Sequence, residues 1–193
     1  MKQYTGMLRW LAFGLLLAGS TVAWARQDAA TTRVLPAVGT IQVAFTPGDD
    51  AAGLIIQAIA QARQRIRVQA FSFTHRGIAD ALIAARQRGV DVVVIVDPQQ
   101  AVRIATSVVD VMSVAGVPVF YDAEHASAHN KVMVIDADTA PVVITGSYNF
   151  THAAQYKNAE NLLIVRGNPA LAKAYAANWQ FHRDHSSVFP PRP

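Results

Sequence analysis

Residues 90–96 form a nearly unbroken run of β-branched side chains, and this run limits the fold more than any other part of the sequence. A strand without polar alternation is normally buried on both faces, because helices cover both sides of its sheet. Strand-like segments at residues 40–45 and 67–73 precede the run, and each is followed by apolar residues at helical spacing. The sequence therefore predicts an α/β fold with a mixed, mainly parallel sheet that is flanked by helices on both faces.

The rest of the chain supplies further elements of the same kind. The patterns predict, in order, a helix at 103–115, a strand at 117–121, a hairpin at 129–149, a strand at 161–165 and a helix that begins at Pro169. Together these elements make a single domain over residues 40–188, with a flexible lead-in at 26–39 and a frayed tail at 189–193.

Residues 1–25 have the pattern of a secretory signal peptide. Lys2 and Arg9 come before a short apolar stretch, and Ala23 and Ala25 provide the small-residue exit, so cleavage is expected after Ala25. The mature protein would then be periplasmic or secreted and would have no membrane segment. An uncleaved membrane anchor is the alternative, although the apolar stretch is short for a span.

Composition excludes some kinds of chemistry and permits others. The chain has no cysteine, which excludes disulfides, thiolate metal sites and a thiol nucleophile. The formal net charge is +4, and it would fall by two with the loss of Lys2 and Arg9. A mildly basic protein of this kind can accept a polyanionic substrate without requiring one.

The predicted hairpin carries polar side chains at alternating positions near the ends of its two strands. Residues two apart in a strand share a face, so His129 and Lys131 should point the same way. By the same rule, Ser147 and Asn149 should share a face of the returning strand, while Asp136 should point away from Lys131. Paired strands would bring an imidazole, an ammonium, a hydroxyl and an amide together. This set of donors around a nucleophile suits a phosphoryl group.

The same stretch resembles a known family. His129, Lys131 and Asp136 follow the pattern His-x-Lys-x4-Asp, and the run that begins Gly146-Ser147-x-Asn149 completes the signature of the phospholipase D superfamily. The continuation to Ala154, followed by Asn158, Glu160 and Asn161, is similar to its small bacterial endonuclease branch. The resemblance implies a phospholipase D-like α-β-α sandwich and a phosphodiesterase. Because the sequence has no convincing acidic cluster, we expect no catalytic metal and no other cofactor.

The resemblance also implies a role for each residue of the motif. His129 would attack phosphorus to form a phosphohistidine, and Glu160 would accept a hydrogen bond from the other nitrogen of that ring. Lys131, Ser147 and Asn149 would bind the phosphate. Asp136 and Gly146 would be structural. Because members of the family usually need two such motifs and this chain has one, a homodimer is implied, with the two copies of His129 meeting on the two-fold axis.

The expected function is non-specific hydrolysis of DNA, with RNA as an open alternative, because phosphate contacts carry no base information. His75, Tyr148 or Phe150 could stack on bases. A lipid phosphodiesterase of the same superfamily is an alternative, and a nucleic-acid-binding module without turnover is another. We interpret His182, Asp184 and His185 as polar surface groups that complement the end of the last helix, and not as metal ligands.

Overall fold

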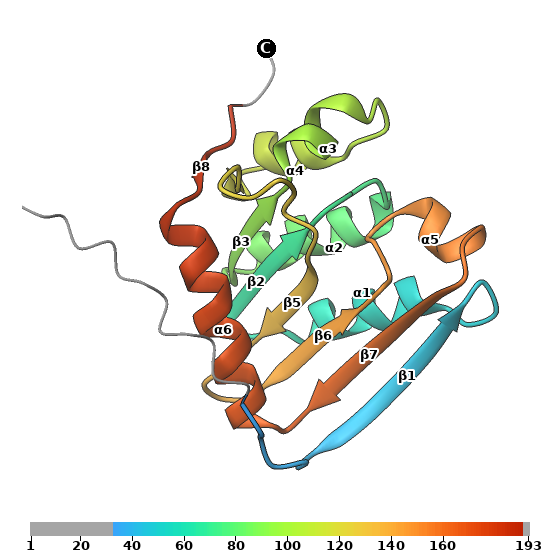
Figure 1. Ribbon diagram of the computed structural model, residues 1–193, viewed down its shortest axis with the longest axis vertical. Coiled ribbons are helices and arrows are strands. Elements are labelled where there is room, and N and C mark those ends of the chain that lie inside the picture. Colours follow the sequence, from blue (N-terminus) through green and yellow to red (C-terminus); the bar gives the residue numbers. More distant parts are fainter. Residues whose placement is uncertain (1–32, 191–193) are drawn as a thin grey trace, which may run out of the picture. The chain divides into compact units, whose positions relative to one another are not determined.

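The computed structural model describes residues 33–190, and the chain from Leu35 onward forms one compact unit. The predicted signal peptide at 1–25 lies outside the described residues. An eight-stranded sheet runs through the unit in the order β1-β7-β6-β5-β2-β3-β4-β8 (Figure 1). The strands are β1 Thr40–Thr46, β2 Arg65–Ala70, β3 Asp91–Val96, β4 Val119–Tyr121, β5 Lys131–Ile135, β6 Val142–Gly146, β7 Glu160–Arg166 and β8 Ser187–Val188.

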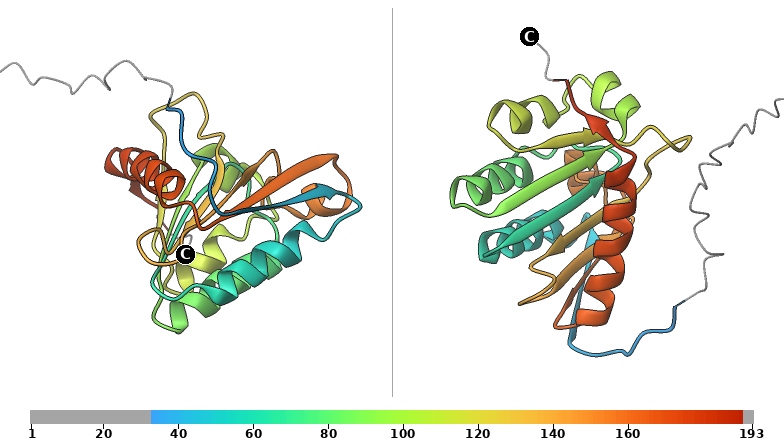
Figure 2. Two further views of the ribbon diagram at one scale, coloured as in Figure 1. Left: turned by 90° about the horizontal axis from the view of Figure 1, so that it is seen from below. Right: turned by 90° about the vertical axis from the view of Figure 1, so that its left-hand side faces the viewer.

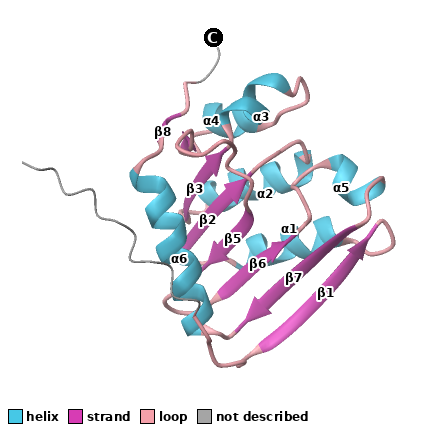
Figure 3. Ribbon diagram, viewed as in Figure 1, coloured by secondary structure: helices cyan, strands magenta, loops and turns pink. Residues whose placement is uncertain are grey.

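Helices alternate with these strands along most of the chain (Figure 3). They are α1 Ala51–Gln61, α2 Arg76–Gln87, α3 Pro98–Arg103, α4 Val109–Val114, α5 His152–Tyr156 and α6 Pro169–Asp184. The helix α6 lies on one face of the sheet, and α1 and α2 lie on the other (Figure 2). The predicted α/β sandwich with helices on both faces is therefore confirmed.

The prediction of a mainly parallel sheet is wrong. Within the described residues, β2–β3 and β3–β4 are parallel neighbours, and every other neighbouring pair is antiparallel. The strands β1 and β2 run in the same direction, as a connecting helix favours, but they are not neighbours. The hairpin β5–β6 and the strand β7 are inserted between them, and each of these pairs with its neighbours in the antiparallel sense.

The predicted helix at 103–115 is also wrong, because two short helices stand in its place. The Asp97 side chain accepts a hydrogen bond from Gln100 N at 2.9 Å, and Pro98 occupies the first turn, so α3 begins earlier than predicted. After α3, the backbone N–H of Val108 donates to Phe73 O at 3.1 Å. Because the N–H of Val108 is bonded to Phe73, it cannot bond within a continuous helix, and α4 begins at the next residue.

Both ends of the domain are more firmly held than the sequence predicts. In the lead-in, Pro36 O accepts a hydrogen bond from Asn168 Nδ2 at 2.9 Å. In the predicted tail, Phe189 is 3% exposed, its N–H donates to Val119 O, and its ring packs on Tyr121 with ring centroids 5.0 Å apart. The assignment of Phe189 to a frayed tail is therefore wrong, because this side chain belongs to the hydrophobic core.

Burial also corrects the interpretation of α6. Trp179 and His182 are buried, as their places on the predicted apolar stripe require. The interpretation of His182 as a surface group is wrong, since its Nδ1 lies 2.6 Å from a carboxylate oxygen of the buried Asp122. His185 contacts the same carboxylate, whereas Asp184 is exposed. Within the described residues, no helix combines the length and apolar character that a membrane span requires.

Candidate active site

The candidate residues lie at one end of the sheet. The strand β5 runs antiparallel to β2, so its first residue, Lys131, pairs with the last residue of β2, Ala70. In the same way, β6 ends at Gly146 beside the start of β7, where Glu160 lies. The carboxyl ends of β2, β3 and β6 thus meet the amino ends of β5 and β7 (Figure 1). This is the edge at which open α/β sheets commonly bind ligands.

His129 and Lys131 contact each other at this edge, as their shared face predicts. Lys131 Nζ lies 3.0 Å from His129 Nδ1 and 3.2 Å from Nε2, and it donates to His129 O at 2.9 Å. A neutral imidazole has one acceptor nitrogen, so the ammonium can donate to one ring nitrogen at a time. His129 is exposed, which leaves its ring accessible to a substrate.

Phe71 is a neighbour of this pair that the sequence reasoning did not assign to the site. Its ring centroid lies 4.3 Å from that of His129, and Lys131 Nζ lies 4.9 Å from the Phe71 centroid. The Phe71 ring therefore packs against the imidazole and faces the ammonium, which is a favourable cation–π position. The available signal was its place directly after a buried strand that ends at this edge of the sheet.

Lys131 is buried, with 8% of its surface exposed. Burial lowers the pKa of its ammonium below the ordinary value, while the nearby negative charge of Glu160 opposes this change. The buried ammonium of Lys131 is only partly balanced by the charge of Glu160, so binding a further anion beside it is favourable. This is the electrostatic condition that favours binding of a phosphoryl oxygen.

We expect the Lys131→Met variant to lose at least about 100-fold in turnover and yet to melt at a higher temperature than the wild type at neutral pH. The stability difference follows from the lowered pKa, because the unfolded chain binds the proton more tightly than the folded one. The wild type should therefore recover stability as the pH rises toward 10.5, and the difference between the two proteins should shrink. Thermal melts across this pH range measure the effect, with Lys173→Met on the exposed side of α6 as the control. A variant that melts lower than the wild type at every pH would contradict this account.

Ser147 and Glu160 join the ends of β6 and β7. The Ser147 hydroxyl donates to Glu160 Oε2 at 2.6 Å and accepts hydrogen bonds from Asn161 N and Nδ2 at 3.1 and 3.3 Å. Glu160 Oε1 accepts from Asn158 Nδ2 at 3.0 Å. The hydroxyl of Ser147 is exposed and has a single proton, so it can rotate from the carboxylate to an arriving phosphate.

The predicted hydrogen bond between Glu160 and His129 is not found within the described residues of a single chain. The carboxylate of Glu160 is instead engaged by Ser147 and Asn158, and the His129 ring contacts Lys131. Glu160 acts on the site through its charge, which reaches Lys131. The role of Glu160 as a hydrogen-bond partner of the nucleophile stays a prediction for the assembled protein.

Ser147 and Asn149 do not lie in a strand, so the argument from their shared parity is wrong. The strand β6 ends at Gly146, whose φ of 150° is one that residues with side chains rarely adopt. A Cβ at Gly146 would overlap Asn161 O, so glycine allows β6 and β7 to approach closely there. Beyond this point the chain leaves the sheet, and Asn149 Oδ1 is buried with no hydrogen-bond partner in the part of the chain that the structure describes.

The predicted stacking role of Tyr148 and Phe150 is wrong. Both side chains are 1% exposed, and Tyr148 Oη donates to Gln155 Oε1 at 3.3 Å. Burial raises the pKa of the Tyr148 phenol well above its ordinary value, so this residue stays neutral. His75 caps α2, where its Nδ1 accepts a hydrogen bond from Ile78 N at 3.3 Å. Tyr148 and Phe150 anchor the segment after Gly146 in the core.

Asp136 lies at the far end of β5 from Lys131 and has a structural position. Its carboxylate accepts backbone hydrogen bonds from Arg63, Gln64 and Arg65, at 2.7, 2.8 and 2.8 Å, and so holds the connection between α1 and β2. Its own backbone has a φ of +46°, which begins the turn to β6. Among residues 33–190, the hydrogen bonds of Asp136 do not reach the residues around His129.

Asp97 is a further positioning residue that the sequence reasoning missed. It is 2% exposed, and its two oxygens bind different segments, because Oδ1 caps α3 while Oδ2 accepts from Ala128 N at 3.0 Å. Ala128 directly precedes His129, so Asp97 fixes the approach of the chain to the imidazole. The signal was an acidic residue at the carboxyl end of the apolar run 90–96.

An exposed imidazole against a buried ammonium, with an exposed hydroxyl and a carboxylate at the same end of the sheet, suits chemistry on phosphate esters. A family model described as cardiolipin synthase, PLD-like domain, matches residues 55–183. A protein named phospholipase D from Rickettsia typhi is 34% identical over 148 residues, which cover 77% of this chain and 70% of that protein. The chain belongs to the phospholipase D superfamily and is a phosphodiesterase of that kind.

Solved structures agree with this assignment. Nuc from Salmonella typhimurium, a phospholipase D family member, is 33% identical, with a TM-score of 0.74 over 79% of this chain and 99% of that one. NucT from Helicobacter pylori gives a TM-score of 0.69 at 24% identity, over 79% of this chain and 100% of that one. The second likeness shows the fold alone.

Proposed function

We propose that this enzyme is an endonuclease that hydrolyses phosphodiester bonds of DNA, with RNA as a second substrate class, and that no metal ion takes part in the reaction. The observation that carries the proposal is the contact between the exposed His129 ring and the buried Lys131 ammonium, at 3.0 Å. A nucleophile and a cation in contact can attack and hold one phosphate without a metal. The match to nearly the whole of Nuc supports the small, single-motif branch of the superfamily.

In the proposed reaction, an unprotonated nitrogen of His129 attacks phosphorus and one ester bond breaks. The His129 ring of the partner subunit donates a proton to the leaving oxygen, and a phosphohistidine forms. The same partner ring then takes a proton from water, which attacks phosphorus and releases His129. Lys131, Ser147 and Asn149 hold the other phosphoryl oxygens in both steps.

Cleavage of plasmid DNA tests the proposal. The purified enzyme should convert supercoiled plasmid to open and linear forms at the same rate with added magnesium and after brief exposure to a chelator. Short single-stranded DNA and RNA in the same assay define the substrate range. A protein that shifts the plasmid in a gel without cleaving it would be a binding module, and cleavage that stops at once in chelator would exclude the metal-free reaction.

A lipid phosphodiesterase is the second candidate, and a specific surface favours it. Ile41, Val43 and Phe45 on the edge strand β1 are 66%, 51% and 62% exposed. Phe45 pairs with Asn161, directly after Glu160, so this apolar strip begins beside the candidate site. The name of the Rickettsia typhi relative, phospholipase D, agrees with this alternative. Cleavage of short-chain phosphatidylcholine without cleavage of plasmid would establish the lipid function.

We further propose that the mature protein is periplasmic or secreted, since residues 1–25 have the pattern of a cleavable signal peptide. A homodimer is proposed because the chain carries one copy of a motif that the reaction uses twice. The amino-terminal sequence of exported protein should begin at Arg26. A mature protein that still begins at Met1 would contradict cleavage.

A further inference from the structure

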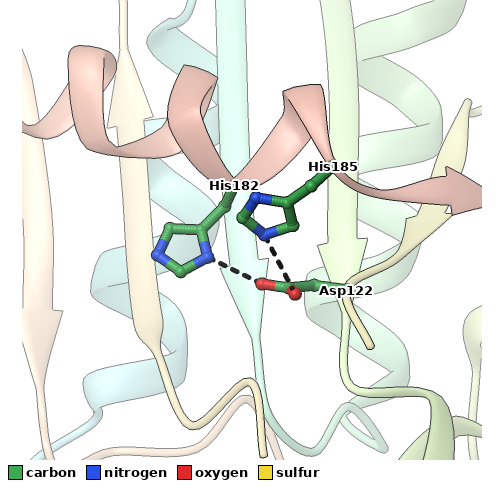
Figure 4. Close-up of side chains that lie close together, drawn as sticks. All are labelled: Asp122, His182 and His185. Carbon is green, nitrogen blue, oxygen red and sulfur yellow. Dashed lines mark hydrogen bonds and ion pairs between the residues drawn. The ribbon is translucent and has the colours of Figure 1, made fainter. Parts of the chain in front are cut away.

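A buried carboxylate and two histidines meet at the end of α6, and none of the three is a residue assigned to the phosphate (Figure 4). Asp122 directly follows β4, His182 lies in the last turn of α6, and His185 caps that helix. Asp122 Oδ2 lies 2.6 Å from His182 Nδ1, and Asp122 Oδ1 lies 3.2 Å from His185 Nε2. The side chains of Asp122, His182 and His185 are 1%, 9% and 20% exposed, so this is a built and largely buried cluster.

The three ligand atoms of this cluster are close enough to surround one ion. Each lies within 4.8 Å of the others, whereas ligands on a tetrahedral zinc ion, at about 2.0 Å from the metal, are roughly 3.3 Å apart. Small side-chain movements therefore convert the hydrogen-bonded arrangement into a coordinated one. The spacing of His182 and His185 places both rings on one side of the helix end, which is a common arrangement of metal-binding histidines.

A third histidine lies beside these two rings. His125 follows Asp122 in the chain, and its ring centroid lies 5.4 Å from that of His182 and 5.8 Å from that of His185. The His182 and His185 centroids are 5.4 Å apart. Three imidazoles bound to one tetrahedral zinc would have their centroids about 5 Å apart, given the usual zinc–nitrogen distance. The spacing of the three rings is thus similar to that around one ion, although only His182 and His185 have ligand atoms within 4.8 Å of each other and of Asp122.

The electrostatics of the cluster suit a cation. Burial alone would raise the pKa of Asp122, but hydrogen bonds from His182 and from Glu124 N hold this pKa below its ordinary value. Histidine nitrogens and carboxylate oxygens are both common zinc ligands, and structural zinc sites take four ligands in all.

We propose that Asp122, His182 and His185 bind one divalent transition-metal ion of the zinc class, and that the neighbouring His125 supplies the fourth ligand when the ion is bound. The ion would join the end of α6 to the start of the segment that runs from β4 to His129. We assign the ion a structural role, which is to stabilise this segment. The inference is independent of which phosphodiester the enzyme cleaves.

Titration of zinc into the full mature protein, freed of metal by a chelator, tests this inference. We expect saturable binding of one ion per chain in competition with a chromophoric chelator, and a melting temperature that rises with zinc concentration. His185→Gln should weaken binding by more than about 100-fold, since even the loss of an outer-shell partner typically costs 10-fold to 100-fold. His125→Gln should weaken binding less, because a water molecule can replace it.

The matched control is His152→Gln, since His152 is an exposed histidine on α5 outside the cluster, and this variant should bind zinc like the wild type. His185 is the preferred test position because His182 is buried, and a folding defect at His182 would be uninformative. The readouts are binding and thermal stability, so they hold whether or not DNA is cleaved. Absence of saturable binding by the wild type, or equal binding by His185→Gln and His152→Gln, would overturn the proposal and leave a hydrogen-bonded Asp–His cluster.

Discussion

Replacement of His129 by alanine is expected to lower turnover by at least about 1,000-fold, while the protein keeps its fold. The imidazole is exposed and the core does not depend on it, so its removal takes away the nucleophile without opening a cavity. Single-turnover cleavage of plasmid measures the loss, and circular dichroism with thermal melting verifies the fold. The control is His152→Ala, which removes an exposed imidazole on α5 and should cleave at the wild-type rate.

Mixed dimers sharpen this prediction. If one site uses His129 from both subunits, a dimer of one wild-type and one His129→Ala chain has no complete site. Co-expression of the two chains at known ratios should therefore give activity that falls with the square of the wild-type fraction. Activity that falls in simple proportion to this fraction would show that each subunit works alone, and the shared-site mechanism would be wrong.

The features of the fold that could be predicted were those that depend on the pattern of neighbouring residues in the sequence. The run at 90–96 gave a buried central strand, and the alternation of elements gave helices on both faces. The pairing of β1 with β7 could not be predicted in this way, because it joins residues more than 100 positions apart in the chain. No local signal at Thr40–Thr46 indicates which strand will be its neighbour.

In the candidate site too, local contacts could be predicted from the sequence and long-range contacts could not. The rule that residues two apart in a strand share a face correctly predicted the contact between His129 and Lys131, because the two residues are close neighbours in the sequence. Parity failed at Ser147 and Asn149 because the strand ends at Gly146, which a pattern of side chains does not reveal. Asp97 and Phe71 were missed because their contacts with the segment around His129 depend on the order of the strands.

Replacement of Asp136 by alanine should lower the free energy of unfolding by about 3 kcal/mol. The carboxylate accepts three backbone hydrogen bonds from Arg63, Gln64 and Arg65, and the variant leaves these donors without their partner. Alanine also tolerates the positive φ at this position less well than aspartate does. Urea unfolding monitored by circular dichroism measures the change.

Asp138→Ala is the matched control for this prediction. Asp138 lies two residues further along the same turn, with a side chain that is 78% exposed and a single 3.4 Å contact to Arg65. An exposed ion pair contributes little, so this variant should stay within about 0.5 kcal/mol of the wild type. Below its melting temperature, Asp136→Ala should still cleave substrate, because the carboxylate holds the connection before β2 and has no contact with the His129 ring. A fully folded Asp136→Ala protein without activity would instead make this aspartate a participant in the reaction.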